Sequence, residues 1–258
     1  MKCWSRIATG LTVVVLPLAA ARAQQQPMPE DYPIHSMDRP QPVVVTPGKS
    51  AADAPSDAVV LFSGRDLSAW QGDSGKAAPW LVKSGYVEVK PESGAIQTRD
   101  SFADCQLHIE WSAPTPASGE GQERGNSGVF FGGGRYEVQV LDSYKNETYP
   151  DGQAGAMFGQ YPPLVNPARP PGEWESYDII FHGPRFSSVG KLLAPARATV
   201  LMNGVVVQDN VALTGPTAYQ RRPPYAPYPS KQPILLQDHG MKVRYRNIWI
   251  RPLPGPRP

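Results

Sequence analysis

Proline and glycine interrupt this sequence so often that a helical fold is excluded. The chain has 30 Pro and 24 Gly among its 258 residues, and both residue types are unfavourable inside helices. No window longer than about ten residues keeps the apolar spacing of a helix. Short apolar or alternating segments separated by turn residues predict an all-β domain instead. Their number favours a two-sheet antiparallel sandwich over a small barrel.

The candidate strands are short and are bounded by turn residues. They cover residues 58–62, 86–89, 95–98, 105–111, 128–131, 136–141, 177–181, 198–202, 205–209, 234–236 and 242–250. Asn203-Gly204 lies between two of these segments. This dipeptide favours the type I′ turn that matches the twist of paired strands, so it predicts a tight hairpin.

The first 23 residues are typical of a secretory signal peptide. Lys2 and Arg6 precede an apolar run, and Ala21-Arg22-Ala23 has the pattern of a cleavage site. The run is too short to cross a membrane, which needs roughly 20 apolar residues. We therefore expect an exported protein, periplasmic or secreted, whose mature chain has no membrane-spanning segment.

The remainder of the chain divides into an arm, a domain and a tail. Residues 24–57 contain seven Pro and little apolar pattern, so we expect a disordered, extended or loosely docked arm. The folded domain is expected at 58–253, followed by a tail at 254–258. Removal of residues 1–23 leaves 22 basic and 23 acidic residues, a balance that gives no reason to expect a nucleic-acid partner. The single remaining cysteine, Cys105, excludes an internal disulfide and a cysteine zinc site.

Polar side chains alternate with apolar ones on three candidate strands. Glu137 and Gln139 share a face of one strand. Glu110 lies on the polar face of a second, and Arg246 on that of a third. Such faces are either the solvated outside of a sandwich or the walls of a polar groove. A groove of this composition suits sugars, because carboxylates, amides and guanidiniums bind hydroxyls and aromatic rings stack on C–H faces.

A turn with an acid and an imidazole follows one apolar strand and precedes another. Asp238 and His239 are adjacent there, and such a pair can transfer protons. The alternative is that both side chains cap backbone groups of the turn.

Metal and cofactor motifs are weak. The histidines, at positions 35, 108, 182 and 239, do not have the spacing of metal ligands. Carboxylates and carbonyls are able to hold a divalent cation in such a fold, but no spacing demands one. The sequence therefore requires no cofactor.

Several blocks of residues occur in an order that resembles a known family. They are LFSGRDLSAW at 61–70, GNSGVFF at 125–131, YEVQVLDS at 136–143, GEW at 172–174, YDI at 177–179, NGV at 203–205, LQDHG at 236–240 and RNI at 246–248. Together they are similar to the 3-keto-disaccharide hydrolase domain family, from residue 61 to residue 253. Glu175 departs from the family pattern, which usually has Asn at this position.

The resemblance implies a concanavalin-like jelly-roll sandwich and an exported bacterial enzyme that acts on sugars oxidised at C3. A C3 ketone acidifies the C2 hydrogen, so a base can form an enolate that expels the C1 substituent, and water can then add back. This chemistry needs a base, a group that stabilises the oxyanion and an acid for the leaving oxygen.

The positions of the motifs suggest residues for these roles. His239, oriented by Asp238, and Glu137 are the candidates for the proton transfers, and either is able to be the base. Gln139 and Arg246 are candidates for holding the enolate or the sugar hydroxyls. The other expected sugar-binding residues are Asn126, Glu110, Asp142, Glu173 and Trp174.

Residues 137–142 also resemble, more loosely, the E-x-D-x-x-E strand of laminarinase-type enzymes. Gln139 replaces the middle Asp, and Asp142 replaces the last Glu. A β-bulge near Val140 would bring Asp142 onto the face of Glu137. These replacements argue against a retaining mechanism, which needs two carboxylates about 5 Å apart.

A non-catalytic, exported sugar-binding module is the alternative to an enzyme, because the same sandwich serves lectins. Both interpretations predict a small sugar as the partner, and neither specifies the oligomeric state.

Overall fold

The structure is a computed structural model, and it describes residues 31–254. The expected signal peptide, the first residues of the arm and the tail from residue 255 onward lie outside the described residues. Between residues 31 and 254, no helix is long and apolar enough to cross a membrane.

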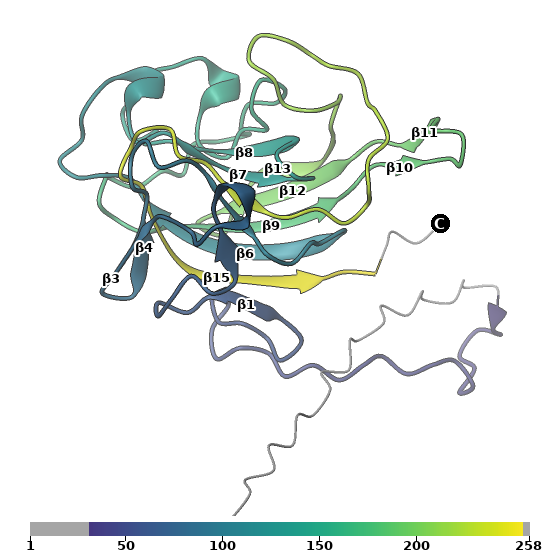
Figure 1. The fold of residues 1–258 in the computed structure, drawn as a ribbon. Helices are drawn as coiled ribbons and strands as arrows, with labels where there is room; N and C mark the ends of the chain where they lie inside the picture. The colour runs from purple at the N-terminus through teal and green to yellow at the C-terminus, as the bar shows by residue number, and fades with distance from the viewer. Residues whose placement is uncertain (1–30, 255–258) are drawn as a thin grey trace, which may run out of the picture.

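Two antiparallel sheets packed face to face form the domain (Figure 1), which confirms the predicted all-β jelly-roll sandwich. The strands of the larger sheet are β1 (Val59–Phe62), β3 (Leu81–Lys83), β4 (Tyr86–Glu88), β6 (Cys105–Ser112), β9 (Glu175–His182), β12 (Arg197–Met202), β13 (Val205–Ala212) and β15 (Arg244–Pro252). Those of the smaller sheet are β2 (Trp70–Gln71), β5 (Ile96–Thr98), β7 (Ser127–Phe131), β8 (Tyr136–Val140) and β14 (Leu235–Leu236). A hairpin of β10 (Arg185–Phe186) and β11 (Leu192–Ala194) projects from the sandwich.

The strand order of each sheet follows from long-range connections. The larger sheet runs β13-β12-β9-β6-β15-β4-β3, with β1 also paired to β15. The smaller sheet runs β2-β5-β14-β7-β8. Strand β14 therefore lies between β5 and β7 although it is more than a hundred residues away from both in the sequence. Segments far apart in the chain meet on the outer face of the smaller sheet.

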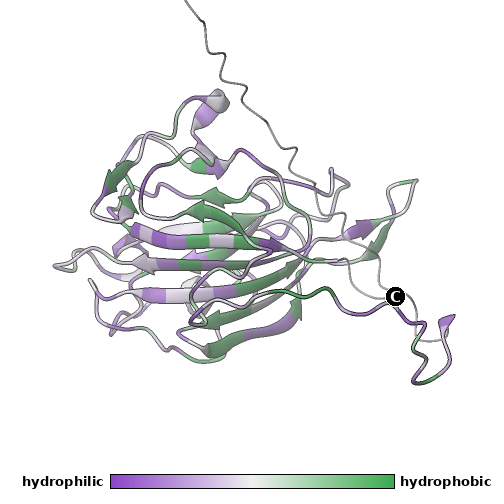
Figure 2. Cartoon of the chain, turned by 90° about the horizontal axis from the view of Figure 1, so that it is seen from below, coloured by the Kyte–Doolittle hydropathy of each residue, from purple (hydrophilic) through white to green (hydrophobic). Residues whose placement is uncertain are grey.

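The core lies between the two sheets. Leu107, Ile109 and Trp111 of β6 are buried in it, and the alternate residues His108 and Glu110 point to the other side of the larger sheet. Figure 2 shows this alternation of hydrophilic and hydrophobic residues along the strands. Burial of one face fixes the register, because a slip of one residue would expose the whole apolar set.

Two buried tyrosines connect the sheets across the core. Tyr177 of β9 donates a hydrogen bond from its hydroxyl to the Gln139 carbonyl at 2.7 Å. Tyr245 of β15 donates to Ser127 Oγ at 2.6 Å. Both tyrosines are fully buried, so these bonds hold β7 and β8 at a fixed distance from the larger sheet.

Most of the expected strands are present, and the Asn203-Gly204 hairpin joins β12 to β13. Its two residues have φ values of 54° and 77°, and a type I′ turn requires positive φ at both central positions. The two-residue and three-residue strands β2, β3, β10 and β11 were not predicted, because they are too short to show a period. β7 and β8 pair without a register shift up to Val140. Directly after it, Val140 and Leu141 both lie in the core, and Asp142 N donates to the Arg124 carbonyl one residue out of register, which agrees with the expected bulge near Val140.

The described part of the arm, residues 31–57, contains no strand. Its first part extends away from the domain, and its last part lies near β1 on the outer side of the larger sheet (Figure 1). The carbonyl of Ala52 accepts hydrogen bonds from Asn247 Nδ2 at 2.8 Å and Trp249 Nε1 at 2.9 Å. Asp57 forms an ion pair with Arg251 at 2.5 Å. The second half of the arm is thus docked on the domain.

Candidate active site

Glu137 and Gln139 point from β8 to the outer face of the smaller sheet. Val138 alternates with them and is buried in the core. Phe130 of β7 pairs with Glu137, and Leu235 of β14 pairs with Phe130. Directly paired residues share a face, so this row continues the face of Glu137 across three strands.

Two loop residues bond to the backbone of Glu137, and a glycine leaves space for its carboxyl. The backbone N–H of Glu137 donates to Thr217 Oγ1 at 3.1 Å, and its carbonyl accepts from Phe158 N at 3.2 Å. Gly128 leaves room for the carboxyl, because a Cβ at this position would lie 2.5 Å from Glu137 Oε1. Glycine inside a strand often indicates such a close approach.

Burial makes Glu137 a weak acid. The residue is 5% exposed, and desolvation by burial raises the pKa of its carboxyl to about 8. No ion pair to Glu137 occurs in the described part of the chain. The uncharged acid is therefore the main form at neutral pH.

Carboxamides surround the carboxyl of Glu137. Gln139 Nε2 donates to Gln122 Oε1 at 3.0 Å, and Asn126 Nδ2 donates to the Gln122 carbonyl at 2.8 Å. The other amide atom of Gln139, its oxygen in this orientation, lies 3.2 Å from Glu137 Oε1. With the Gln139 amide turned over, its Nε2 instead donates to Glu137 Oε1 and to the Ser127 carbonyl, both at 3.2 Å.

A cavity of about 650 Å³ opens beside Glu137. Its walls include Tyr149, Phe158 and Tyr219. The charge of Glu137 contributes to the raised pKa of Tyr149, after burial, Tyr219 and Asp151, so the carboxyl and the cavity lie close together. The cavity is within the range of roughly 300–1,000 Å³ found for small-molecule sites.

Asp142 follows β8, which ends at Val140. Its carboxylate accepts from Arg124 Nε at 2.7 Å and from Tyr144 N at 3.1 Å, and it is 3% exposed. These bonds give Asp142 a structural role, and its expected role in sugar binding stays a prediction. Asp142 anchors the segment that carries Asn126.

Asp238 and His239 follow β14 on the smaller sheet. Gln237 N donates to the Gly128 carbonyl at 3.0 Å, so the ladder extends one residue beyond β14, and His239 comes two residues later. The Asp238 carboxylate accepts from the N–H groups of Ser93 at 2.9 Å and Gly94 at 3.0 Å. Asp238 thus caps backbone groups, as in the alternative interpretation of the turn.

His239 itself is exposed. Like β8, β14 is antiparallel to β7, so the chain after β14 leaves the sheet at the edge where β8 ends. His239 and Glu137 belong to the same sheet, separated by one intervening strand. His239 is exposed in the turn after β14, and Glu137 is buried on β8.

Glu110 and Arg246 lie on the opposite side of the sandwich. Arg246 Nε donates to Glu110 Oε2 at 2.6 Å, and the His108 ring stacks on Trp249 with centroids 5.3 Å apart. These residues belong to the outer face of the larger sheet, where the docked arm also binds Trp249. The expectation that they share one groove with Glu137 is wrong, because alternation along a strand does not identify the sheet that carries it.

The 172–174 block belongs to that second face as well. The Trp174 ring centroid lies 4.1 Å from Arg246 Cζ, and Glu173 is exposed beside it. Glu175, which replaces the usual Asn, is buried and accepts from Arg169 N at 2.6 Å and from Asn203 Nδ2. The residue that differs from the family pattern, Glu175, therefore bonds to loop and turn residues away from the smaller sheet.

Sequence reasoning missed Gln122 and the aromatic wall of the cavity. Gln122 lies in the 3₁₀ turn η3 (Gly121–Glu123), and Tyr149 precedes the turn η4 (Pro150–Gly152). Both are in irregular loops, where periodicity carries no information. Gln237 was within a quoted block, and its side-chain Oε1 is buried without a hydrogen-bond partner.

Comparisons with known proteins agree with this architecture. A family model described as a 3-keto-α-glucoside-1,2-lyase-like domain matches residues 57–251. The chain belongs to this family. A candidate glycosyl hydrolase from Parabacteroides distasonis, solved by crystallography, is 46% identical to it, with a TM-score of 0.81, and the match covers 85% of this chain and 95% of the other.

Two more structures of candidate glycosyl hydrolases from the same organism show the fold of the 3-keto-α-glucoside-1,2-lyase-like family. One is 20% identical with a TM-score of 0.56, covering 76% of this chain and 94% of the other. The second is 23% identical with a TM-score of 0.54, covering 76% and 99%. A comparison with curated proteins gives no match.

No group of three or more His, Cys, Asp or Glu residues in the described range is arranged to hold a metal ion.

Proposed function

We propose that this protein cleaves the glycosidic bond of 3-keto-glucosides by elimination across C1 and C2. Membership of the 3-keto-α-glucoside-1,2-lyase-like family supports the substrate class. The observation that supports the chemistry is the buried Glu137 carboxyl, whose pKa near 8 keeps a proton at neutral pH beside a cavity of ligand size. An acid in this state is what a departing glycosidic oxygen requires.

The proposed reaction has two stages. A base removes the C2 hydrogen as a proton, and the electron pair forms an enolate on the C3 oxygen. The enolate then reforms the ketone with a C1=C2 double bond, the C1–O bond breaks, and the leaving oxygen takes a proton from an acid. If water adds across the double bond, with hydroxyl at C1 and hydrogen at C2, the net result is hydrolysis.

Each step has a candidate among the residues of the smaller sheet. Glu137 in its protonated form gives its proton to the leaving oxygen. His239, exposed at the edge where β14 ends, removes the C2 proton, and Asp238 holds its turn through the hydrogen bonds to Ser93 and Gly94. The carboxamide of Gln139 binds sugar hydroxyls or the enolate oxygen.

Product analysis in deuterated water tests the proposal. With phenyl 3-keto-glucoside, wild-type protein should release phenol and form a C1=C2 unsaturated ketone faster than a sample without enzyme. Any product formed by addition of water to this ketone should carry deuterium at C2. Glu137→Gln should slow phenol release by at least roughly tenfold, while Glu173→Gln, an exposed carboxyl on the other face, should not. A sugar product that keeps its original hydrogen at C2 would contradict elimination. Binding of the glucoside without release would favour the sugar-binding module instead.

We also propose export, to the periplasm or the medium, on the basis of the signal-like residues 1–23. The mature protein recovered from an expressing bacterium should begin at Gln24. A mature N-terminus at Met1 would contradict export by this route.

A further inference from the structure

The cavity beside Glu137 has a charge that a neutral sugar does not need. Arg221 and Arg222 line it together with a single acid, Asp151. Both arginines are exposed, and neither belongs to an ion pair in the described part of the chain. The guanidinium groups are thus available to a ligand. They are the donors best suited to bind a carboxylate through two parallel hydrogen bonds.

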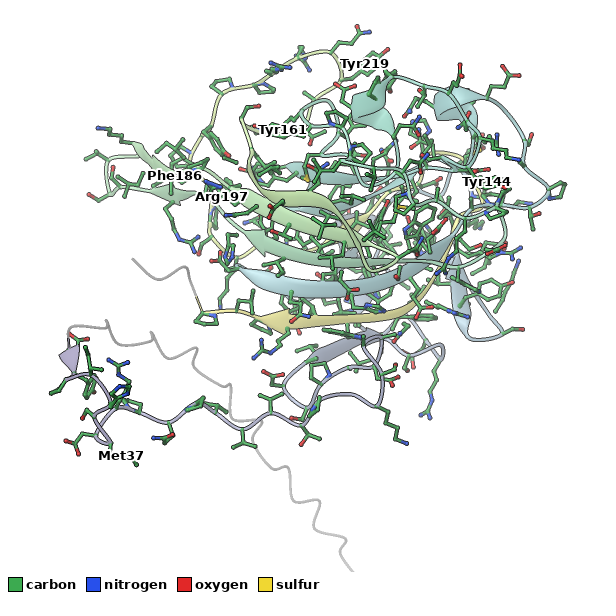
Figure 3. The ribbon with its side chains drawn as sticks, turned by 180° about the vertical axis from the view of Figure 1, so that it is seen from behind. Met37, Tyr144, Tyr161, Phe186, Arg197 and Tyr219 are labelled. Atoms are coloured by element: carbon green, nitrogen blue, oxygen red, sulfur yellow. The ribbon has the colours of Figure 1, made fainter. Side chains whose placement is uncertain are left out.

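Aromatic rings form the rest of the wall. Tyr149 and Phe158 meet edge to face with centroids 6.1 Å apart, and Tyr219 is 67% exposed on the opposite segment. Figure 3 shows Tyr219 on the loop that crosses this end of the molecule. An exposed ring in a cavity wall offers stacking area for a planar ligand.

Two segments of the cavity wall are held by the backbone of the proposed acid, although Glu137 itself is not a wall residue. Phe158 N donates to the Glu137 carbonyl, and Thr217, which accepts from Glu137 N, directly precedes the wall segment 218–222. A group released by protonation at Glu137 therefore starts next to these walls. The cavity is therefore close enough to receive such a leaving group.

We propose that this cavity binds the leaving group and selects 3-keto-glucosides of phenolic acids, which are linked through the phenol oxygen and keep a free carboxylate. The aromatic ring stacks on Tyr219, and the carboxylate pairs with Arg221 and Arg222. The inference rests on the proposed elimination for its catalytic part. The binding part depends only on the residues of the cavity.

Two matched substrates separate charge from shape. The 4-carboxyphenyl and 4-carbamoylphenyl 3-keto-glucosides have the same size, and only the first is charged. Wild-type kcat/KM should be higher for the first by roughly tenfold or more. In the double variant Arg221→Gln/Arg222→Gln the preference should fall to about one, with the rate on the carbamoyl substrate kept within about twofold.

The control is Arg65→Gln, which removes an exposed arginine outside the cavity wall and should keep the preference. Equal kcat/KM for the two substrates in the wild type, or a preference that survives in the double variant, would overturn the proposal.

Calorimetric titration with 4-hydroxybenzoate distinguishes failure of this inference from failure of the proposed function. If no 3-keto-glucoside is turned over, the elimination and the leaving-group role both fail. Binding of 4-hydroxybenzoate that is lost in the double variant and kept in Arg65→Gln would then still support an aromatic carboxylate site. Absence of binding to the wild type would overturn the site itself.

Discussion

Replacing Glu137 by Gln should make the protein more stable and less active. Gln has nearly the same shape as protonated Glu and never carries a charge. The substitution removes the group that we expect to protonate the leaving oxygen, and it also removes the cost of ionising a buried carboxyl. A residue kept for packing would show the opposite result, a loss of stability.

The size of the stability gain follows from the pKa of Glu137. Burial raises it from 4.5 to about 8 in the folded protein. Between these pH values the folded state holds a proton that the unfolded state has released, so stability falls as the pH rises. The contribution is fully present below pH 4.5 and is lost by about pH 8. One pKa unit corresponds to about 1.4 kcal/mol, so the total loss is about 5 kcal/mol, of which about 3 kcal/mol is reached at pH 7.

Urea unfolding at pH 4.5, 6, 7 and 8, followed by tryptophan fluorescence, measures this difference. The free energy of unfolding of Glu137→Gln minus that of the wild type should be near zero at the lowest pH and should grow to several kcal/mol at pH 8. Other titrating groups cancel in the difference because both proteins contain them. Glu173→Gln, which changes an exposed carboxyl, is the matched control and should show no such trend.

A difference that stays constant with pH would refute the reasoning, because it would mean that Glu137 titrates alike in the folded and unfolded chains. Its use as an acid near neutral pH would then lose its basis. A variant that is both stabilised at pH 8 and fully active would leave the electrostatics intact and remove the catalytic role.

Three further outcomes are expected. His239→Ala should lower turnover of a 3-keto-glucoside by at least roughly tenfold, with an unchanged urea midpoint because the side chain is exposed; wild-type turnover would remove the proposed base. Arg246→Ala should leave kcat/KM within about twofold of wild type and cost about 1 kcal/mol of stability through its lost surface ion pair and ring contact; a large loss of turnover at full stability would mean that the larger sheet takes part in catalysis. Burial lowers the pKa of His108, but its hydrogen bond to Asp178 outweighs this and raises the pKa to about 9, so its stabilising contribution is complete below pH 6.5 and is lost as the pH rises toward 9. Asp178→Asn should therefore cost roughly 2 kcal/mol at pH 6 and much less at pH 9.5 in urea unfolding, and an equal cost at both values would contradict this pairing.

The local patterns of the sequence determined the class of fold and many of its strands. Proline and glycine excluded helices, and alternation of apolar residues located β6, β8 and β15, because burial of one strand face is a property of neighbouring residues. The Asn203-Gly204 turn was predictable for the same reason, since a type I′ turn depends on two adjacent φ angles. Short strands such as β2 and the loops around Tyr149 have no period, so no local signal could reveal them.

Only the tertiary structure decided which polar faces meet. Glu137 and Glu110 both lie on alternating strands, and nothing in either segment tells which sheet it joins. The pairing of β6 with β9 and β15, and of β7 with β8 and β14, places them on opposite sides of a core. The same long-range packing buries Glu137 and leaves His239 exposed, and desolvation, which sets the pKa of a carboxyl, depends on residues far away in the sequence. The sequence shows that Glu137, Glu110 and His239 are present. The pKa of Glu137 and the neighbours of all three residues follow from contacts that only the folded chain makes.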